Sequence, residues 1–358
     1  MVRYRRPVSD RTERDPEPPP RLTALGWDRG WADALADVGP DAEGARVLQH
    51  HGAGLVLALA DETRTVMFTH RLDPEPTVGD WVALVDGEIS TVLPRRSLLR
   101  RRAPSGGEQQ LAANVDRLLL VCGLDRPVKD GRIQRGTAIA HDAGAEPVVV
   151  LTKAADPDAA DPDDARADVQ AGNPGLDVVV TSVMEGEGLG ALEDLVAGRT
   201  VALLGESGAG KSSIVNALLG TEVALVGDVR GGDSKGRHTT TTRELHLLSN
   251  GGILIDSPGI REVGLVGDTD AVEETFAEVA EVAEMCRFSD CAHESEPGCA
   301  IRAALESGEL DPERVQRWQD LMEETVAAER RSNPHERRRH EKRFARVVKE
   351  IKRQKGLD

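Results

Sequence analysis

The stretch 205–213, GESGAGKSS, constrains the fold of this chain more than any other. Gly205, Gly210, Lys211 and Ser212 have the spacing of a phosphate-binding loop, Gly-x4-Gly-Lys-Ser. The apolar run 200–204 before it predicts a buried strand, and the run 213–219 after it predicts a helix. A turn from strand to helix at these glycines favours an α/β nucleotide-binding domain over a chance glycine-rich turn.

This loop binds phosphate through its backbone. Its N–H groups and the positive end of the helix hold the anion, Lys211 adds a point charge near the β- and γ-phosphates, and the Ser212 hydroxyl is placed to ligate Mg²⁺. The nucleotide-binding residues predicted here are Gly205, Glu206, Ser207, Gly208, Ala209, Gly210, Lys211, Ser212 and Ser213.

A second segment of the site follows the loop's helix. The glycine-rich stretch 227–242 is the natural switch, and the strand predicted at 252–255 ends in Asp256, which can hold Mg²⁺ through water. Asp-x-Pro-Gly at this distance from the phosphate loop favours a GTPase. Thr240 and Thr241 are the switch hydroxyls expected at Mg²⁺ and the γ-phosphate, with Thr240 assigned to Mg²⁺.

Catalysis has no obvious water-positioning residue. Ile260 follows the box where many GTPases carry a Gln, so intrinsic hydrolysis should be slow. His238 is the best alternative polar group, and a solvated loop histidine is the competing interpretation. The residues predicted to be catalytic are His238, Thr240, Thr241, Asp256 and Gly259.

Composition limits the class of protein. The 358 residues predict two or three domains. No apolar run approaches the roughly 20 residues of a spanning helix and none near the start suggests a signal peptide, so we expect a cytoplasmic protein with no membrane contact. The net charge of −17 disfavours indiscriminate binding of nucleic acid.

The pattern along the chain divides it into four parts. Residues 1–44 predict an N-terminal arm whose first ~20 residues are disordered. Five short strands at 45–48, 54–59, 65–69, 80–85 and 88–93 indicate a small β-barrel of the oligonucleotide/oligosaccharide-binding (OB) kind over 45–103, although another small barrel has the same spacing. Alternating strands and helices indicate an α/β domain over 104–268, and residues 269–358 predict a helical metal-binding domain with a basic last helix.

Three cysteines and a histidine lie close together near the C-terminus. Cys286, Cys291, His293 and Cys299 have the spacing Cys-x4-Cys-x-His-x5-Cys, which predicts one structural, closed zinc site per chain. Free buried thiols are the alternative.

Two basic clusters stand out in an acidic protein. Arg100, Arg101 and Arg102 lie at the exit of the predicted barrel, and Arg337, Arg338 and Arg339 lie in a basic last helix predicted to begin at Asn333 and Pro334. Contact with an RNA backbone is one interpretation and a solvated surface is the other.

The order of the boxes is reversed relative to an ordinary GTPase. The nearest match to the guanine-reading box Asn-Lys-x-Asp, the stretch 151–156 (LTKAAD), and the stretch 181–183 both precede the phosphate loop. In this order the chain resembles the circularly permuted GTPases of the small ribosomal subunit biogenesis family RsgA. The resemblance runs nearly end to end, through VGDWVAL at 78–84, ANVD at 113–116, EGEGL at 185–189, KGRHTTT at 235–241, DSPGIRE at 256–262 and CRFSDCAHESEPGCAI at 286–301.

The resemblance implies an OB-like barrel, a permuted GTPase domain and a C-terminal zinc domain, with GTP and Mg²⁺ bound and a role late in small-subunit maturation. It adds Thr152, Lys153, Asp156, Ser182 and Val183 to the GTP-binding residues. The expected partners are the small ribosomal subunit with its rRNA and GTP or GDP, and we expect a monomer. The competing function is a nucleotide-regulated RNA-binding module in which hydrolysis is incidental.

The guanine box departs from the family pattern. Thr152 replaces Asn, and Ala155 stands where the guanine-binding Asp belongs. A local bulge that presents Asp156 is the preferred interpretation, and loss of the contact is the alternative.

Overall fold

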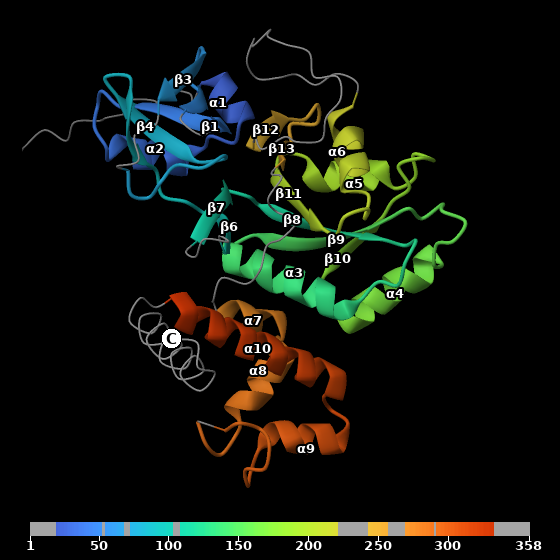
Figure 1. The fold of residues 1–358 in the computed structure, drawn as a ribbon. Helices are drawn as coiled ribbons and strands as arrows, with labels where there is room; N and C mark the ends of the chain where they lie inside the picture. Colours follow the sequence, from blue (N-terminus) through green and yellow to red (C-terminus); the bar gives the residue numbers. More distant parts are fainter. Residues whose placement is uncertain are drawn as a thin grey trace, which may run out of the picture.

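A computed structural model gives the arrangement of the chain (Figure 1). The structure describes residues 19–51, 54–67, 72–102, 108–220, 243–256, 269–289 and 291–332, without the side chains of 102 and 328–332.

Eleven of the described strands form one sheet. Its order is β10-β9-β8-β11-β13-β12-β1-β2-β3, with β4 paired to β1 and β5 to β4. The strands are β1 Glu43–His51, β2 Gly54–Ala58, β3 Thr63–Met67, β4 Trp81–Val85, β5 Glu88–Val92, β6 Leu98–Arg102, β7 Glu108–Ala113, β8 Arg117–Gly123, β9 Glu146–Thr152, β10 Asp177–Val180, β11 Thr200–Gly205, β12 Arg243–Leu247 and β13 Ile253–Asp256.

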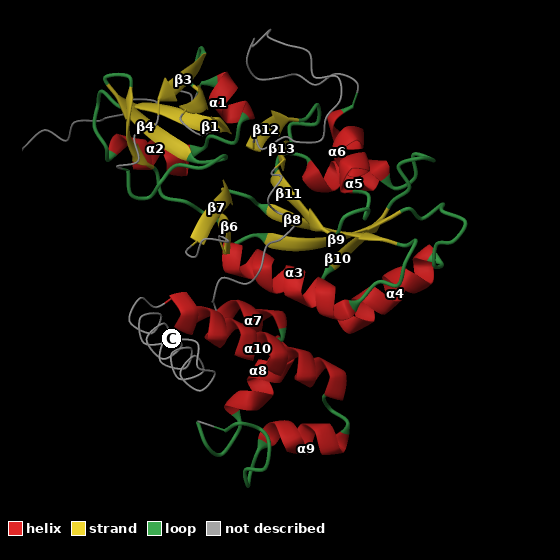
Figure 2. Ribbon diagram, in the orientation of Figure 1, coloured by secondary structure: helices red, strands yellow, loops and turns green. Residues whose placement is uncertain are grey.

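Helices cover both faces of the parallel part of this sheet, as Figure 2 shows. On one face, the Leu118 and Leu120 side chains of β8 share a core with α3 (Asp130–Ala143) and α4 (Pro162–Gly172). On the other, Leu119 and Val121 share a core with α5 (Leu189–Val196) and α6 (Lys211–Leu219). Successive residues of a strand face opposite sides of a sheet, so a strand covered on both faces is continuously apolar. The predicted α/β class is confirmed.

The nucleotide-binding strands and the N-terminal β unit share this one sheet. Strands β10, β9, β8, β11 and β13 are parallel, and β12 runs antiparallel to β13. On its other side β12 pairs antiparallel with β1, through Gln49↔Glu244 and His50↔Arg243. All five strands predicted between 45 and 93 are present, in the antiparallel order β3-β2-β1-β4-β5. That this unit is an OB barrel stays a prediction.

Part of the segment predicted as an N-terminal arm is folded. Helices α1 (Pro20–Ala24) and α2 (Arg29–Ala36) lie within it. Trp27 and Trp31 are buried against Trp81 of β4, with the Trp27 and Trp81 ring centroids 4.8 Å apart. These aromatic rings pack on a strand distant in sequence, so residues from 20 onward are folded against the β unit, and the division of the chain at residue 44 stays a prediction.

The arginine cluster after β5 lies on one arm of a hairpin. Strands β6 and β7 pair antiparallel from Leu98↔Ala113 to Arg102↔Glu108.

The C-terminal helices pack beneath α3 (Figure 1). They are α7 Thr269–Thr275, α8 Ala277–Glu284, α9 Ala300–Ser307 and α10 Pro312–Ser332. Arg135 of α3 makes a two-pronged ion pair with Glu324 of α10, with both N–O distances at 2.7 Å. Arg314 of α10 donates to the Gly172 carbonyl at the end of α4, at 2.9 Å. Across the described ranges, no helix has the length and apolarity that crossing a bilayer requires.

Candidate nucleotide and metal sites

The predicted phosphate loop joins β11 to α6. Gly208 and Gly210 have φ angles of 80° and 94°, a region that L side chains rarely adopt. A Cβ added to Gly210 would lie 2.9 Å from the Thr152 hydroxyl, and one added to Gly205 would lie 2.4 Å from the Val121 carbonyl oxygen. Gly208 and Gly210 are therefore required by their backbone conformation, and Gly205 and Gly210 by the lack of space for a side chain. The resulting turn brings the N-terminal amides of α6 to the loop, where they can bind an anion.

Polar side chains of the loop lie at its surface. Ser207, Ser212 and Ser213 are exposed, whereas Ala209 is buried beneath the loop. The Lys211 ammonium donates to the carbonyl oxygens of Gly205 and Glu206, across the loop that it follows. Its charge therefore lies at the loop itself, where a point charge can neutralise phosphate.

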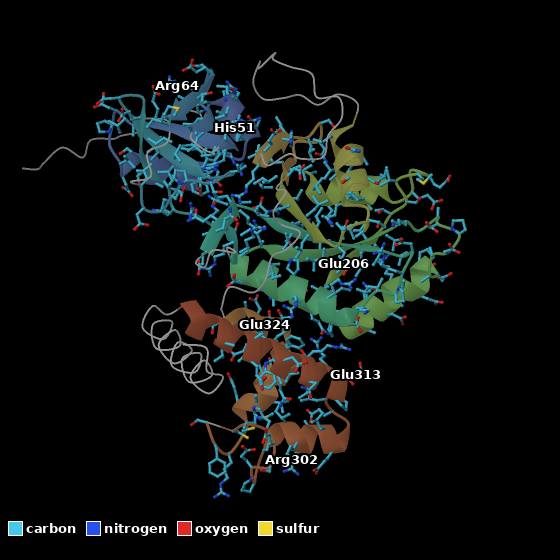
Figure 3. All side chains as sticks on the ribbon, in the orientation of Figure 1. His51, Arg64, Glu206, Arg302, Glu313 and Glu324 are labelled. Atoms are coloured by element: carbon cyan, nitrogen blue, oxygen red, sulfur yellow. The ribbon has the colours of Figure 1, made fainter. Side chains whose placement is uncertain are left out.

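Glu206 links the loop to α3. Its carboxylate lies 2.7 Å from the Arg132 guanidinium. Arg132 is one turn from Arg135, which binds Glu324 on α10, and Figure 3 labels both glutamates. The first turns of α3 thus contact the phosphate loop and the C-terminal helices.

The guanine-box loop follows β9 and packs against the phosphate loop. Thr152 is 2% exposed, and its hydroxyl donates to the Ala209 carbonyl at 2.5 Å. Lys153 has a φ of 62°, and its ammonium lies 2.7 Å from an Asp125 carboxylate oxygen. Thr152 is therefore a support beneath the loop, while Lys153 lies beside it.

The displaced carboxylate of Asp156 is exposed. Its Oδ1 accepts from the Asp158 backbone N–H at 3.0 Å, as in an Asx turn. Asp156 lies in the box loop, and its carboxylate is used in a local turn.

The stretch 181–183 lies beside the guanine-box loop. Thr181 N–H donates to the Leu151 carbonyl at 2.7 Å, and Ala154 N–H donates to the Thr181 carbonyl at 3.2 Å. Ser182 is buried and exchanges two backbone hydrogen bonds of 3.0 Å with Glu187, while Val183 is half-buried. This small hairpin holds the backbone of 182–183 next to the guanine box.

Asp256 ends β13 and is exposed. Because β13 runs parallel to β11, with Ala202 opposite Ile255, Asp256 lies at the same sheet edge as the phosphate loop. The predicted residues His238, Thr240, Thr241 and Gly259 lie outside the described residues.

Cys286, Cys291, His293 and Cys299 converge below the nucleotide-binding unit. Their ligand atoms all lie within 4.8 Å of one another. The sulfurs of Cys286 and Cys299 are each 3.6 Å from His293 Nδ1. Cys286 follows α8, and Cys299 caps α9. Three thiolates and one imidazole are a closed tetrahedral donor set, so the four residues fit a structural metal ion.

The arginines predicted to contact RNA differ in their surroundings. Arg100 lies 3.3 Å from each of the carboxylates Glu108 and Asp142. Arg101 donates to the Gln109 amide oxygen at 2.9 Å. The side chains of Arg102, Arg337, Arg338 and Arg339 lie outside the described set. Arg100 thus has acidic partners within the protein, which an RNA phosphate would have to displace.

Three residues near the phosphate loop were not predicted from the sequence: Asp125, Arg126 and Arg132. They follow β8 or begin α3. An Arg126 nitrogen lies 3.4 Å from the position that a Cβ would take on Gly208. Arg126 and Lys153 hold the pKa of Asp125 at about 2. Their position directly after β8 could have predicted this, because β8 is the strand between β9 and β11 in the sheet.

Known relatives match this chain over most of its length. A family model described as RsgA GTPase matches residues 92–266. A Streptomyces coelicolor protein described as small ribosomal subunit biogenesis GTPase RsgA is 44% identical over 317 residues, covering 85% of this chain and 86% of that protein. A Vibrio parahaemolyticus protein described as small ribosomal subunit biogenesis GTPase RsgA 2 is 42% identical over 308 residues, covering 85% of each chain.

Solved structures resemble the fold. The crystal structure of YjeQ from Thermotoga maritima superposes with a TM-score of 0.57 at 25% identity, covering 80% of this chain and 99% of that one. The structure of YloQ, described as a circularly permuted GTPase, has a TM-score of 0.55 at 22% identity and covers 80% and 96% of the two chains. These likenesses agree with the reversed order of boxes.

Proposed function

The chain belongs to the RsgA GTPase family, and we propose that it hydrolyses GTP in the late maturation of the small ribosomal subunit. The observation that carries this proposal is the meeting of three boxes at one sheet edge. The phosphate loop after β11, the guanine-box loop after β9 and Asp256 at the end of β13 all follow parallel strands. Carboxyl ends of parallel strands are where such sheets bind their ligands.

Different loops would bind different parts of GTP. The amides of 205–213 and the start of α6 hold the phosphates, and Lys211 neutralises their charge. Mg²⁺ supplies charge neutralisation between the β- and γ-phosphates, and Ser212, Thr240 and Asp256 are the residues that would hold it. The stretch 182–183 and Lys153 would border the guanine, with Asp156 as its candidate carboxylate partner.

Catalysis is assigned to the switch. His238 would orient the attacking water. Thr241 and the backbone of Gly259 would contact the γ-phosphate. Slow turnover by the free protein is expected, since Ile260 offers no hydrogen bond to water.

The C-terminal domain would bind zinc and contact the ribosomal subunit. Zinc suits the Cys3His donor set because it accepts a closed tetrahedron of thiolate and imidazole. For RNA contact we propose Arg101 and Arg102, together with Arg337, Arg338 and Arg339 near the C-terminus. Arg100 is a weaker candidate because Glu108 and Asp142 already pair with it.

The deciding experiment compares GTP turnover by the purified protein with and without small ribosomal subunits. We expect strong stimulation by the subunits, and loss of turnover in Lys211→Ala and Ser212→Ala. Stimulation should fall steeply with salt, because phosphate contacts release counterions. Binding to the subunit without any stimulation would instead identify a nucleotide-regulated RNA-binding module. Full turnover in both variants would refute the nucleotide site.

A further inference from the structure

Lys153 has its acidic partner outside the guanine box. The carboxylate of Asp156, which belongs to that box, accepts from Asp158 N–H in a local turn. The Lys153 ammonium lies 2.7 Å from Asp125, which follows β8. The partner of this lysine therefore comes from the neighbouring strand.

The local backbone brings Asp125 to this position. At the end of the β8–β9 ladder Gly123 pairs with Thr152, and Leu124 N–H donates to the Thr152 carbonyl at 2.9 Å. A Cβ on Gly123 would lie 2.5 Å from Asp125 Oδ1 and 3.6 Å from Lys153 Cδ. The bare glycine thus leaves the space in which the carboxylate and the lysine stem meet.

This ion pair lies next to the phosphate loop. The same Cβ position on Gly123 is 3.7 Å from the Cα of Ala209. Arg126 donates to both carboxylate oxygens of Asp125, at 3.2 and 3.3 Å, one of them the oxygen that Lys153 also binds, and reaches toward Gly208. The Asp125 carboxylate is therefore held between two cations, one in the guanine-box loop and one over the phosphate loop.

We propose that Asp125 is a positioning residue for nucleotide binding, which fixes the Lys153 side chain so that its alkyl stem forms a wall for the purine ring. The inference rests on the proposed function, because it assigns a role within the same site. It acts on the base half of the nucleotide, so the phosphate contacts of Lys211 are not involved. Asp125 determines nucleotide affinity without taking part in hydrolysis.

The test measures GDP, GTP and ADP affinity by titration calorimetry, together with subunit-stimulated turnover. Asp125→Asn should weaken GDP and GTP binding by the same factor, about tenfold, since its neutral amide no longer gives the Lys153 ammonium a charged hydrogen-bond partner. KM should rise while kcat stays within about twofold. Asp125→Glu should recover most of the affinity. Asp194→Asn, an equal change of charge on the exposed face of α5, should bind as wild type.

A double-mutant cycle separates positioning from a general loss of structure. Lys153→Met keeps the stem and removes the charge, so Asp125→Asn should cost little more in that background. Additive losses, or wild-type GDP affinity in Asp125→Asn, would overturn the inference, provided thermal unfolding shows folded protein. If Lys211→Ala abolishes binding while Asp125→Asn does not change it, only this inference fails. If wild type binds no guanine nucleotide, the proposed function fails and the inference with it.

Discussion

Replacing Thr152 by Val tests whether the guanine-box loop supports the phosphate loop. The Thr152 side chain is nearly inaccessible, and its hydroxyl donates to the Ala209 carbonyl at 2.5 Å. Valine has the same shape, so no cavity opens, but its methyl group cannot donate a hydrogen bond. The buried Ala209 carbonyl would lose this partner.

An unsatisfied buried polar group costs about 1–3 kcal/mol. Ala209 belongs to the phosphate loop, so much of this cost should appear as weaker nucleotide binding as well as lower stability. The range corresponds to a roughly 5- to 150-fold increase in the Kd for GDP. The Cys122 carbonyl, at 3.3 Å from the same hydroxyl, is a weaker second acceptor and adds little.

The assay combines GDP titration with urea unfolding of the same preparations. Thr152→Ser is the matched control, because it keeps the hydroxyl and should bind GDP within about threefold of wild type. Thr152→Asn, which restores the residue of the usual box, should retain binding too. If Thr152→Val shows the Kd and unfolding midpoint of wild type, the hydrogen bond does not support the loop and the reasoning is refuted.

Two further predictions concern the metal-binding helices and the contact between α3 and α7. Elemental analysis of fresh protein should give one zinc per chain. Cys291→Ser should unfold the region around α8 and α9 before the nucleotide-binding unit, because metal ligation stabilises the structure locally. The ring of Trp318 lies 5.5 Å from that of His293, so its fluorescence reports this local unfolding. Burial holds the pKa of His141 below its ordinary 6.5 despite Glu274 nearby, so the folded state favours the neutral ring and stability should fall as pH drops below about 6.5. Urea unfolding at pH 7.5 and 5.5 measures this, and an equal pH dependence in His141→Gln would contradict it.

The central parallel strands were predicted from the sequence because their residues are buried on both sides. The apolar runs of β8, β9 and β11 have no polar alternation, which is typical of central parallel strands. Strand β12, with the sequence RELHL, was missed because four of its five residues are only half-buried and two are charged. The β6 strand was missed because its run of arginines is typical of a solvated surface, and the carboxylate partners of Arg100 lie on other elements.

The site was predictable where chemistry depends on local spacing. The phosphate loop and the Cys3His cluster are short patterns, so the residues come together as the spacing predicts. Contacts between distant segments were not predictable. The hydroxyl of Thr152 finds its acceptor 57 residues away, and Asp125 reaches Lys153 only because β8 and β9 are neighbours in the sheet.

The shared sheet has a mechanical consequence for the β unit of β1–β5. Three ladder steps, β11 to β13, β13 to β12 and β12 to β1, separate the phosphate-loop strand from that unit, a span of roughly 14 Å at the usual strand spacing. Buried Arg46 of β1 adds a cross-brace, because it donates to the Leu25 carbonyl and to the Thr200 hydroxyl of β11. A torsion of the β unit against the nucleotide-binding unit would have to break the Arg46–Thr200 hydrogen bond as well as the β1–β12 ladder. The two units therefore present their surfaces to a partner at one fixed angle, as a single rigid body, and not as two flexibly linked domains.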